Sequence, residues 1–498
     1  GQGDAQALHW LVGDRYVSRS LNEAFAFLPG APKELPKPDQ APGIAIGLTQ
    51  PVYAPSGVTA FVGGRVISMR DAENTEEVIE DGVVIVDGDR IRAVGARADI
   101  SVPAGARVID VSGKTLIPGI VDAHAHAAHF GQGVVPQQNW AYYANLAFGI
   151  TTLHDPSATN EFVFSQAELV KAGELVGPRV FSTGTILYGA DGDFKAVVDS
   201  LDDARAHLKR MQALGAFSVK SYNQPRRDQR QQINTAAREL SMLVVEEGGS
   251  TQFHNLTMVI DGVTGVEHNL PVAPLYNDVI GLMSRTDVRN TPTLVVAYGG
   301  LNSEYWWYAR DNVWEEPRLN RYFPKDTLGA RAIRRETAPD WDYYHIEIAR
   351  AAKQLRDAGV RIQVGGHGQM QGLSPHWEMW SLAQGGFTPF EVLRAATIDG
   401  ADYIGMGASI GSLEAGKQAD LVVLDGNPLA DIRDSDNTTM VMVDGRLFDL
   451  KADMAEVGGR GAPAPEFYWQ RHVDGNGFGI QYGPTGACHC PKSAAHAH

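Results

Sequence analysis

Apolar and polar residues alternate with two different periods along the chain, and the change of period divides the chain into regions. From residue 60 to 111, short runs rich in Val and Ile are separated by turn pairs such as Asp87-Gly88. The runs are residues 60–62, 64–67, 82–86 and 90–94. Short strands return late in the chain, at residues 411–424 and 440–447. We therefore expect a small composite β-sandwich, formed from segments before and after the middle of the chain.

The middle of the chain alternates strand-like apolar runs with helical periods. The apolar run at residues 115–126 is followed by seven further strand-like segments. These are residues 149–155, 178–182, 217–222, 242–247, 265–268, 291–296 and 360–365. Eight strands that each precede a helix, over about 250 residues, are typical of an α/β fold of the (β/α)8 TIM barrel class.

The N-terminal residues have a different pattern. Two short apolar pieces around Gly13-Asp14 predict a β-hairpin, and residues 29–56 carry seven prolines, which indicates an extended linker. The chain is thus expected to divide into five segments. They are the hairpin and linker (1–56), the first sandwich part (57–114), the barrel (115–405), the second sandwich part (406–450) and a C-terminal extension (451–498).

Composition narrows the classes of function. The chain has 498 residues, 44% of them hydrophobic, and a formal net charge of -16, which argues against a nucleic-acid partner. The two cysteines, Cys488 and Cys490, lie near the C-terminus, so no disulfide is expected across the body of the fold. No run of about 18 apolar residues occurs, so we expect no transmembrane segment.

Two histidines end the apolar run at residues 115–126. Alternate side chains of a β-strand share a face, so His124 and His126 are expected to point the same way and to bind one cation. Imidazole nitrogens bind zinc at about 2.0 to 2.1 Å. His129, in the loop beyond, is expected to be an ordinary loop histidine.

Several motifs together resemble those of the amidohydrolase superfamily, in its imidazolonepropionase- and prolidase-like branch. They are residues 115–126, 220–227, 267–271, 366–369 and 411–424. More narrowly, residues 220–227, 267–271 and 366–369 are similar to the amidohydrolase half of bacterial proteins that carry a TolB-like β-propeller, and the N-terminal hairpin resembles the last hairpin of a propeller blade. The resemblance covers residues 60–450 and implies a TolB-like propeller chain or domain as a partner, an oligomer, and a periplasmic or secreted location.

The resemblance also implies metal ligands. His124 and His126 would bind a first divalent ion, such as zinc, and His268 a second. Lys220 corresponds to a lysine that reacts with CO₂, and the resulting carboxylated lysine bridges two ions. The fifth-strand ligand stays open between two residues: Glu247 stands at the expected spacing, whereas His254, which we favour slightly, is the family's residue type.

Further residues are expected around the site. His367 stands where the family presents an aspartate, so we expect it to be a base or a ligand, with a purely structural histidine as the alternative. Tyr298 is expected to stabilise an oxyanion. Substrate contacts are expected from Tyr222, Arg226, Arg227 and His154. The aromatic run at residues 305–308 would line the mouth or pack against a neighbour.

The function that these residues predict is that of a metal-dependent amidohydrolase. It would cleave an amide-type C–N bond of a small-molecule or peptide substrate, through a metal-activated hydroxide. Peptides, N-acyl amino acids and cyclic amides are all compatible with it. Two alternatives remain: a deaminase or cyclic-amide hydrolase with one metal ion, and a non-catalytic barrel that scaffolds a propeller partner.

Overall fold

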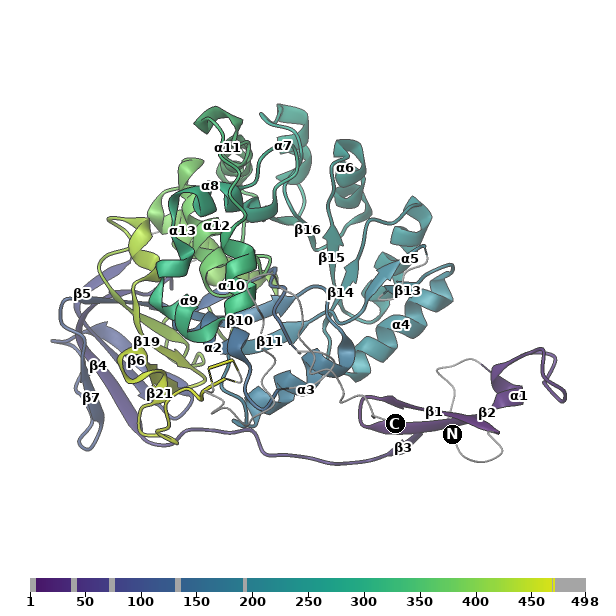
Figure 1. Ribbon diagram of the computed structural model, residues 1–498, viewed down its shortest axis with the longest axis horizontal. Helices are drawn as coiled ribbons and strands as arrows, with labels where there is room; N and C mark the ends of the chain where they lie inside the picture. Colours follow the sequence, from purple (N-terminus) through teal and green to yellow (C-terminus); the bar gives the residue numbers. More distant parts are fainter. Residues whose placement is uncertain are drawn as a thin grey trace, which may run out of the picture. The chain divides into compact units, whose positions relative to one another are not determined.

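The computed structural model describes residues 6–36, 43–70, 77–129, 136–190, 195–467 and 469–470 (Figure 1). The chain divides into two compact units, residues 1–464 and 465–498, and every element below belongs to the first. The Cys488–Cys490 region of the C-terminal extension lies outside the described residues. Among the described helices, none combines the length and apolar character needed to span a membrane.

One large sheet contains strands from before and after the middle of the chain. Its order is β21-β20-β19-β18-β8-β4-β5-β6, and β7 pairs with β4. The strands are β4 (Val58–Ile67), β5 (Val78–Asp87), β6 (Arg90–Ala96), β7 (Arg107–Asp110), β8 (Lys114–Pro118), β18 (Leu421–Asp425), β19 (Thr438–Val443), β20 (Arg446–Asp449) and β21 (Ala455–Glu456). Strand β8 pairs antiparallel with β18, so the segments before and after the middle of the chain lie side by side.

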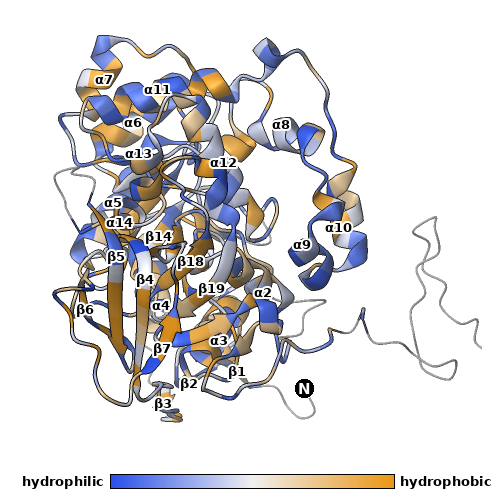
Figure 2. Ribbon diagram, turned by 90° about the vertical axis from the view of Figure 1, so that its left-hand side faces the viewer, coloured by the Kyte–Doolittle hydropathy of each residue, from blue (hydrophilic) through white to orange (hydrophobic). Residues whose placement is uncertain are grey.

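The two faces of this sheet follow the period of two in the sequence. Phe61 and Val84 belong to one apolar cluster, whereas their neighbours Ala60 and Val83 belong to another. In Figure 2, β4 and β5 are hydrophobic over much of their length. Both faces of these strands are therefore buried in apolar clusters. This explains why their sequences are continuous runs of Val and Ile and do not alternate strictly between apolar and polar residues.

The middle of the chain forms two parallel sheets. One has the order β11-β10-β9 and the other β13-β12-β14-β15-β16-β17. Their strands are β9 (Ile120–Asp122), β10 (Ile150–Asp155), β11 (Arg179–Ser182), β12 (Ile186–Tyr188), β13 (Lys195–Val197), β14 (Ser218–Ser221), β15 (Leu243–Glu247), β16 (Gly265–Glu267) and β17 (Arg289–Thr291). The strands predicted at residues 149–155, 178–182, 217–222, 242–247 and 265–268 are thus confirmed.

Helices follow most of these strands and lie outside them (Figure 1). They are α2 (Trp140–Ala147), α3 (Asn160–Lys171), α4 (Leu201–Ala213), α5 (Arg227–Glu239), α6 (Gln252–Asp261), α7 (Asn277–Met283), α11 (His345–Asp357), α12 (Leu373–Gln384), α13 (Pro389–Ala395) and α14 (Ile398–Tyr403). Three more helices, α8 (Ser303–Arg310), α9 (Pro317–Tyr322) and α10 (Lys325–Ala332), form an insertion after β17.

The run at residues 115–126 is two strands rather than one, which corrects the sequence prediction. Strand β8 belongs to the large sheet and β9 to a parallel sheet, and Gly119 separates them. A Cβ atom at Gly119 would lie 2.0 Å from Oγ1 of Thr151, so only glycine fits at this crossing point. His124 and His126 lie beyond the end of β9.

The last two predicted barrel strands are also corrected. Strand β17 ends at Thr291, and Leu294–Val296 form a 3-10 turn, η2, because Thr293 has a φ of 47° and the buried Glu378 carboxylate accepts the N–H groups of Leu294 and Val295. Residues 360–365 contain only a single bridge, between Ile362 and Asn290. Among the described residues, regular strand pairing therefore does not close a barrel.

The N-terminal hairpin is confirmed. Strands β1 (Ala7–Val12) and β2 (Arg15–Ser20) pair antiparallel, and β3 (Gly43–Ala45) adds to β2. The expected linker therefore contributes a strand of its own.

Candidate metal centre

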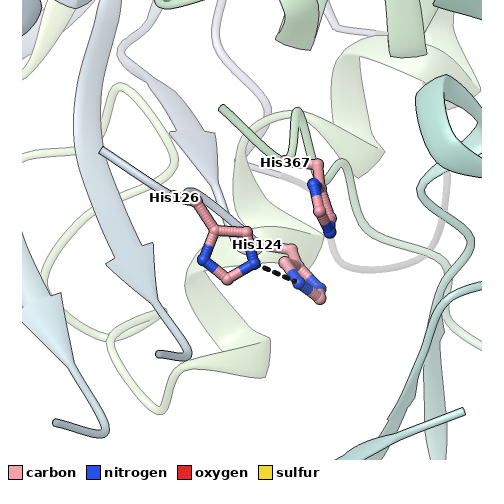
Figure 3. Close-up of side chains that lie close together, drawn as sticks. All are labelled: His124, His126 and His367. Atoms are coloured by element: carbon pink, nitrogen blue, oxygen red, sulfur yellow. Dashed lines mark hydrogen bonds between the residues drawn. The ribbon is translucent and has the colours of Figure 1, made fainter. Parts of the chain in front are cut away.

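Four histidine rings converge where the parallel strands end. The rings of His124, His126, His268 and His367 lie with centroids 4.5 to 5.2 Å apart for all pairs except His126 with His268. The Nε2 atoms of His124 and His126 are 3.2 Å apart (Figure 3). Two nitrogens bound tetrahedrally to one zinc ion at about 2.05 Å would be about 3.3 Å apart. The two side chains therefore point to a common centre, as the His-x-His spacing predicts.

Backbone contacts hold the loop of His367 against the loop of His124. One carboxylate oxygen of Asp122 accepts the N–H of Gly366 at 2.9 Å and that of His124 at 3.2 Å. The N–H of His367 donates to the carbonyl oxygen of His124 at 2.8 Å. A Cβ atom at Gly368 would lie 2.1 Å from the carbonyl oxygen of His126, so the glycines beside His367 allow this close approach.

Two of the histidines have left-handed backbone conformations. The φ angle is 66° at His268 and 54° at His367, a region that costs free energy for residues other than glycine. At His268, bonds from Asn290 to its carbonyl oxygen (2.7 Å) and between Thr293 Oγ1 and its Nδ1 (3.1 Å) stabilise the turn. Such strain at two neighbouring positions is typical of functional sites.

A second group of polar side chains lies at the ends of β14, β15 and β16. Lys220 Nζ is 2.5 Å from Oε2 of Glu247, and Oε1 of Glu247 is 3.1 Å from Nε2 of His268. All three side chains are buried. Burial alone would raise the pKa of Glu247, but the Lys220 and His268 side chains outweigh it and hold that pKa below its usual range.

Two sets of atoms are spaced closely enough to hold a cation. One set is His124, His126 and His367, and the other is His124, Glu247 and His268, with all ligand atoms of a set within 4.8 Å of one another. Burial lowers the pKa of both His124 and His367, and neighbouring cationic groups lower each further, although Glu247 partly opposes this at His367. Neutral imidazoles are the form in which histidine binds metal ions.

The two fifth-strand candidates lie in different surroundings. Glu247 lies in one of the ligand sets, whereas His254 lies in the first turn of α6 and belongs to neither. Gly248 N donates to the carbonyl oxygen of Glu267 at 2.9 Å, so the chain continues along β16 and enters α6 instead of folding back.

The expected substrate contacts divide into two groups. The Tyr298 ring lies 5.3 Å from the His268 ring, and burial with the nearby Glu247 charge raises the Tyr298 pKa to about 12. Tyr222 packs edge-on against Tyr188, with ring centroids 5.7 Å apart. Burial and the Glu247 charge also raise the pKa of Tyr222, so both tyrosines lie near Glu247.

The other three expected contacts have partners elsewhere. Arg227 forms an ion pair with Asp261 at 2.7 Å, and Arg226 is exposed beside Asp228. His154 is fully buried, with Nδ1 3.2 Å from the carbonyl oxygen of Ala123 and Nε2 2.8 Å from Oγ of Ser218. Both ring nitrogens of His154 therefore have partners within the protein, and the side chain supports the structure beneath the site.

Two buried carboxylates behind the histidines were not anticipated from the sequence. Oε2 of Glu267 lies 2.5 Å from Nδ1 of His124, and burial raises the Glu267 pKa to about 7. Oδ2 of Asp155 lies 2.8 Å from Nε2 of His129. His129 lies in a loop and in neither ligand set, but its ring is only 4% exposed and also contacts the Tyr142 hydroxyl at 2.8 Å.

The aromatic run at residues 305–308 packs partly inside the chain. Trp307 and Tyr308 are buried, and the Trp307 indole N–H donates to Oγ of Ser381 at 3.0 Å. The Tyr308 ring packs edge-on against Trp377. These two residues hold α8 against α12.

The sequence of this chain is similar to those of known proteins. Residues 115–448 match the Amidohydrolase family. The imidazolonepropionase of Symbiobacterium thermophilum is 26% identical over 395 residues, which cover 72% of this chain and 89% of that protein. The imidazolonepropionase of a Geobacillus species is 24% identical, over 72% of this chain and 87% of that protein.

Solved structures are similar in fold. A Xaa-Pro dipeptidase with bound methionine has a TM-score of 0.61 at 20% identity, over 79% of this chain and 100% of that one. The A. niger ochratoxinase has a TM-score of 0.59 at 19% identity, over 79% of this chain and 96% of that one. This likeness corresponds to a TIM-barrel-like α/β fold.

Proposed function

Because the chain belongs to the amidohydrolase family, we propose that it is a metal-dependent hydrolase that cleaves an amide-type C–N bond. The observation that carries this proposal is the 3.2 Å separation of the Nε2 atoms of His124 and His126 at the centre of a histidine cluster. Peptides, N-acyl amino acids and cyclic amides are the proposed substrate classes.

The donor atoms present fit a divalent cation. His124, His126 and His367 would hold one ion through nitrogen atoms, and His268 with Glu247 would contribute a nitrogen and an oxygen to a second. Such mixed nitrogen and oxygen donors suit zinc or manganese. A carboxylated Lys220 would add an oxygen donor between the two groups, in place of the ammonium that now contacts Glu247.

The chain's own groups would handle substrate and protons. When bound, a divalent ion lowers the pKa of water and polarises a carbonyl group. With its pKa near 12, Tyr298 keeps its proton at neutral pH and can donate a hydrogen bond to the oxygen that becomes negative. His367 would bind the ion or accept a proton, in the position where the family presents an aspartate.

One observation favours the one-metal alternative, a deaminase or cyclic-amide hydrolase. Nδ1 of His124 contacts Glu267, so only Nε2 is available for a cation, and both ligand sets include His124. One nitrogen lone pair cannot serve two ions at once. A two-metal site would therefore need Lys220 to complete the second set.

Three finer features belong to the same proposal. A closed eight-stranded barrel is supported by the bonds from Ala123 N to the carbonyl oxygen of Val364 (2.9 Å) and from Asn290 N to that of Arg361 (3.2 Å). A composite sandwich is supported by the β8–β18 pairing. A propeller partner or a further copy is supported by apolar side chains on β1 and β3, such as Leu11 and Ile44, which are 62% and 71% exposed.

Metal analysis combined with a substrate screen tests the proposal. Elemental analysis of the purified protein should find about one or about two divalent ions per chain, which separates the one-metal and two-metal forms. The metal-loaded protein should then hydrolyse members of a panel of dipeptides, N-acyl amino acids and cyclic amides. A protein that binds no divalent ion and hydrolyses no member of the panel would be the non-catalytic scaffold.

A further inference from the structure

We propose that Glu267 and Asp155 are positioning residues that orient the two histidines of the His-x-His pair, so that both present Nε2 to the cation. The inference rests on the proposed function for its metal ion, but the geometry on which it depends belongs to the chain alone. Carboxylates that accept the second ring N–H of a metal-bound histidine are a general way of fixing its tautomer and orientation.

Glu267 holds His124. Its Oε2 lies 2.5 Å from Nδ1 of His124, and both side chains are completely buried. The other oxygen, Oε1, accepts hydrogen bonds from the Tyr403 hydroxyl and, at 3.2 Å, from Oγ1 of Thr291. Thr291 is fixed in turn, because Nε2 of Gln363 donates to its Oγ1 at 2.8 Å. The carboxylate therefore has one orientation, and its remaining contact is the imidazole.

Asp155 stands behind His126 in the same way. Its Oδ1 lies 3.4 Å from Nδ1 of His126, and the carboxylate is almost completely buried. Two backbone N–H groups fix it: Ser157 donates to Oδ1 at 2.9 Å and Ala127 to Oδ2 at 3.1 Å. His129 Nε2 lies 2.8 Å from Oδ2. The longer distance to His126 indicates a looser hold than that of Glu267 on His124.

The two contacts have one consequence for the ligand nitrogens. A proton on Nδ1, shared with a carboxylate, leaves Nε2 of each ring with its lone pair. The two Nε2 atoms are 3.2 Å apart, so two lone pairs would face each other and repel unless a positive charge lies between them. Glu267 and Asp155, which come from β16 and β10, thus prepare a nitrogen pair that favours binding of a shared cation.

A merely structural role for these carboxylates makes a different prediction. Tyr403 belongs to an apolar cluster with Val121 and Val245, so its bond to Glu267 could simply stabilise the core. Loss of that bond would then lower stability and leave the histidines as they are. Tyr403→Phe is therefore the matched control, because it removes a partner of the same carboxylate without touching His124.

The experiment compares metal affinity and tautomer in the full chain. Zinc affinity is measured by competition with a chromophoric chelator for the wild type, Glu267→Gln, Glu267→Leu, Asp155→Asn and Tyr403→Phe, and unfolding by urea is measured on each metal-free protein. We expect zinc affinity to fall by about 10- to 100-fold in Glu267→Leu, less in Glu267→Gln and Asp155→Asn, and least in Tyr403→Phe. A Glu267→Leu protein that is folded and binds zinc as tightly as Tyr403→Phe would overturn the inference.

A second measurement, made without metal, tests the inference independently of the proposed function. In the metal-free wild type, ¹⁵N chemical shifts of the imidazoles report which nitrogen carries the proton. We expect His124 to carry it on Nδ1, and Glu267→Leu to shift the ring toward the Nε2–H form. If His124 carries its proton on Nε2 in the metal-free wild type, the positioning role is excluded whether or not the protein binds metal. If the expected tautomer is found but no zinc binds, the proposed function fails and the assignment of Glu267 stands.

Discussion

Nζ of Lys220 lies 2.5 Å from Oε2 of Glu247, and these two nearly inaccessible side chains come from adjacent parallel strands, β14 and β15. Each charge compensates the other, so removal of Glu247 would leave Lys220 without this partner, and removal of Lys220 would leave Glu247 with His268 alone. This pair links the lysine that is expected to be carboxylated with the residue at the fifth-strand ligand position.

Replacement of Lys220 should remove metal and activity together. In Lys220→Ala, we expect the bound metal per chain to fall by about one equivalent and hydrolysis to fall by at least about 100-fold, because Glu247 loses one of its two partners and the bridging donor is lost. Elemental analysis and turnover measure both effects. A wild-type ¹³C resonance from labelled bicarbonate that is absent in the variant would identify the carbamate. Retained turnover in Lys220→Ala would contradict it.

Glu247 and His254 form a matched pair for the fifth-strand ligand. Because Glu247 belongs to a ligand set and His254 lies in α6, we expect Glu247→Ala to weaken divalent-ion binding by at least about 100-fold. In His254→Ala, the affinity should stay within about threefold of the wild type. Isothermal titration of the metal-free proteins provides the comparison, and the reverse order of affinities would restore His254 as the ligand.

Tyr298 should affect the reaction without affecting the metal. Its ring lies beside His268, and its high pKa keeps the hydroxyl as a donor. We expect Tyr298→Phe to lower kcat by about 10²- to 10³-fold at unchanged metal content, the usual cost of removing an oxyanion donor. Steady-state kinetics on a substrate from the screen measures it. A change in KM alone would assign Tyr298 to substrate binding instead.

The raised pKa of Glu378 leads us to expect that the stability of the fold depends on pH. Burial raises its pKa from 4.5 to about 8 in the folded chain, although the N–H groups of Leu294 and Val295 partly oppose this. The folded state therefore binds more protons than the unfolded state between about pH 4.5 and 8, and this contribution to stability is lost as the pH rises through that window. The slope contributed by one group is at most about 1.4 kcal/mol per pH unit.

Glu378→Gln tests this contribution, because glutamine does not ionise. Urea unfolding of the metal-free wild type and variant at pH 5, 6, 7 and 8 should show a shallower decline of the unfolding free energy in the variant. The same decline in both proteins would show that Glu378 does not titrate in this range.

The crossing point at Gly119 predicts a steric cost. A Cβ atom there would lie 2.0 Å from Oγ1 of Thr151 and also close to its Cβ, so the neighbour cannot move away by rotation alone. We expect Gly119→Ala to destabilise the fold by about 1 to 3 kcal/mol. Gly329→Ala is the control: no atom lies within 4 Å of its Cβ position in helix α10, so this change should stabilise the protein by up to about 1 kcal/mol. Equal effects of the two changes would contradict the prediction.

Much of the candidate site could be predicted because its residues follow strands. His124, His126, Lys220 and His268 each stand at or just beyond the end of a predicted apolar run, and parallel strands bring those ends together. The position of Glu247 followed from spacing. The choice between Glu247 and His254 did not, because it depends on the path of the chain after β15, which spacing does not describe.

Other features could not be predicted from periodicity. A period of two assigns faces to a strand but does not say which sheet it joins, so the change of sheet at Gly119 was missed. The turn at Leu294–Val296 depends on Glu378, which lies 84 residues from Leu294 in sequence. Glu267 and Asp155 stand next to His268 and His154 in the sequence. Their contacts with His124 and His126, however, form only when distant parts of the chain come together in the fold.

The pairing of β8 with β18 also has a consequence for how the protein is made. Strand β8 leads through Gly119 into β9 and the His-x-His pair, and in the finished sheet it lies between β4 and β18. While the chain is being synthesised, β18 is still missing when every histidine of the cluster has left the ribosome, so one edge of β8 stays unpaired. The candidate metal ligands therefore reach their final surroundings only late in translation, and a message truncated before residue 421 would encode all of them without the strand that pairs with β8.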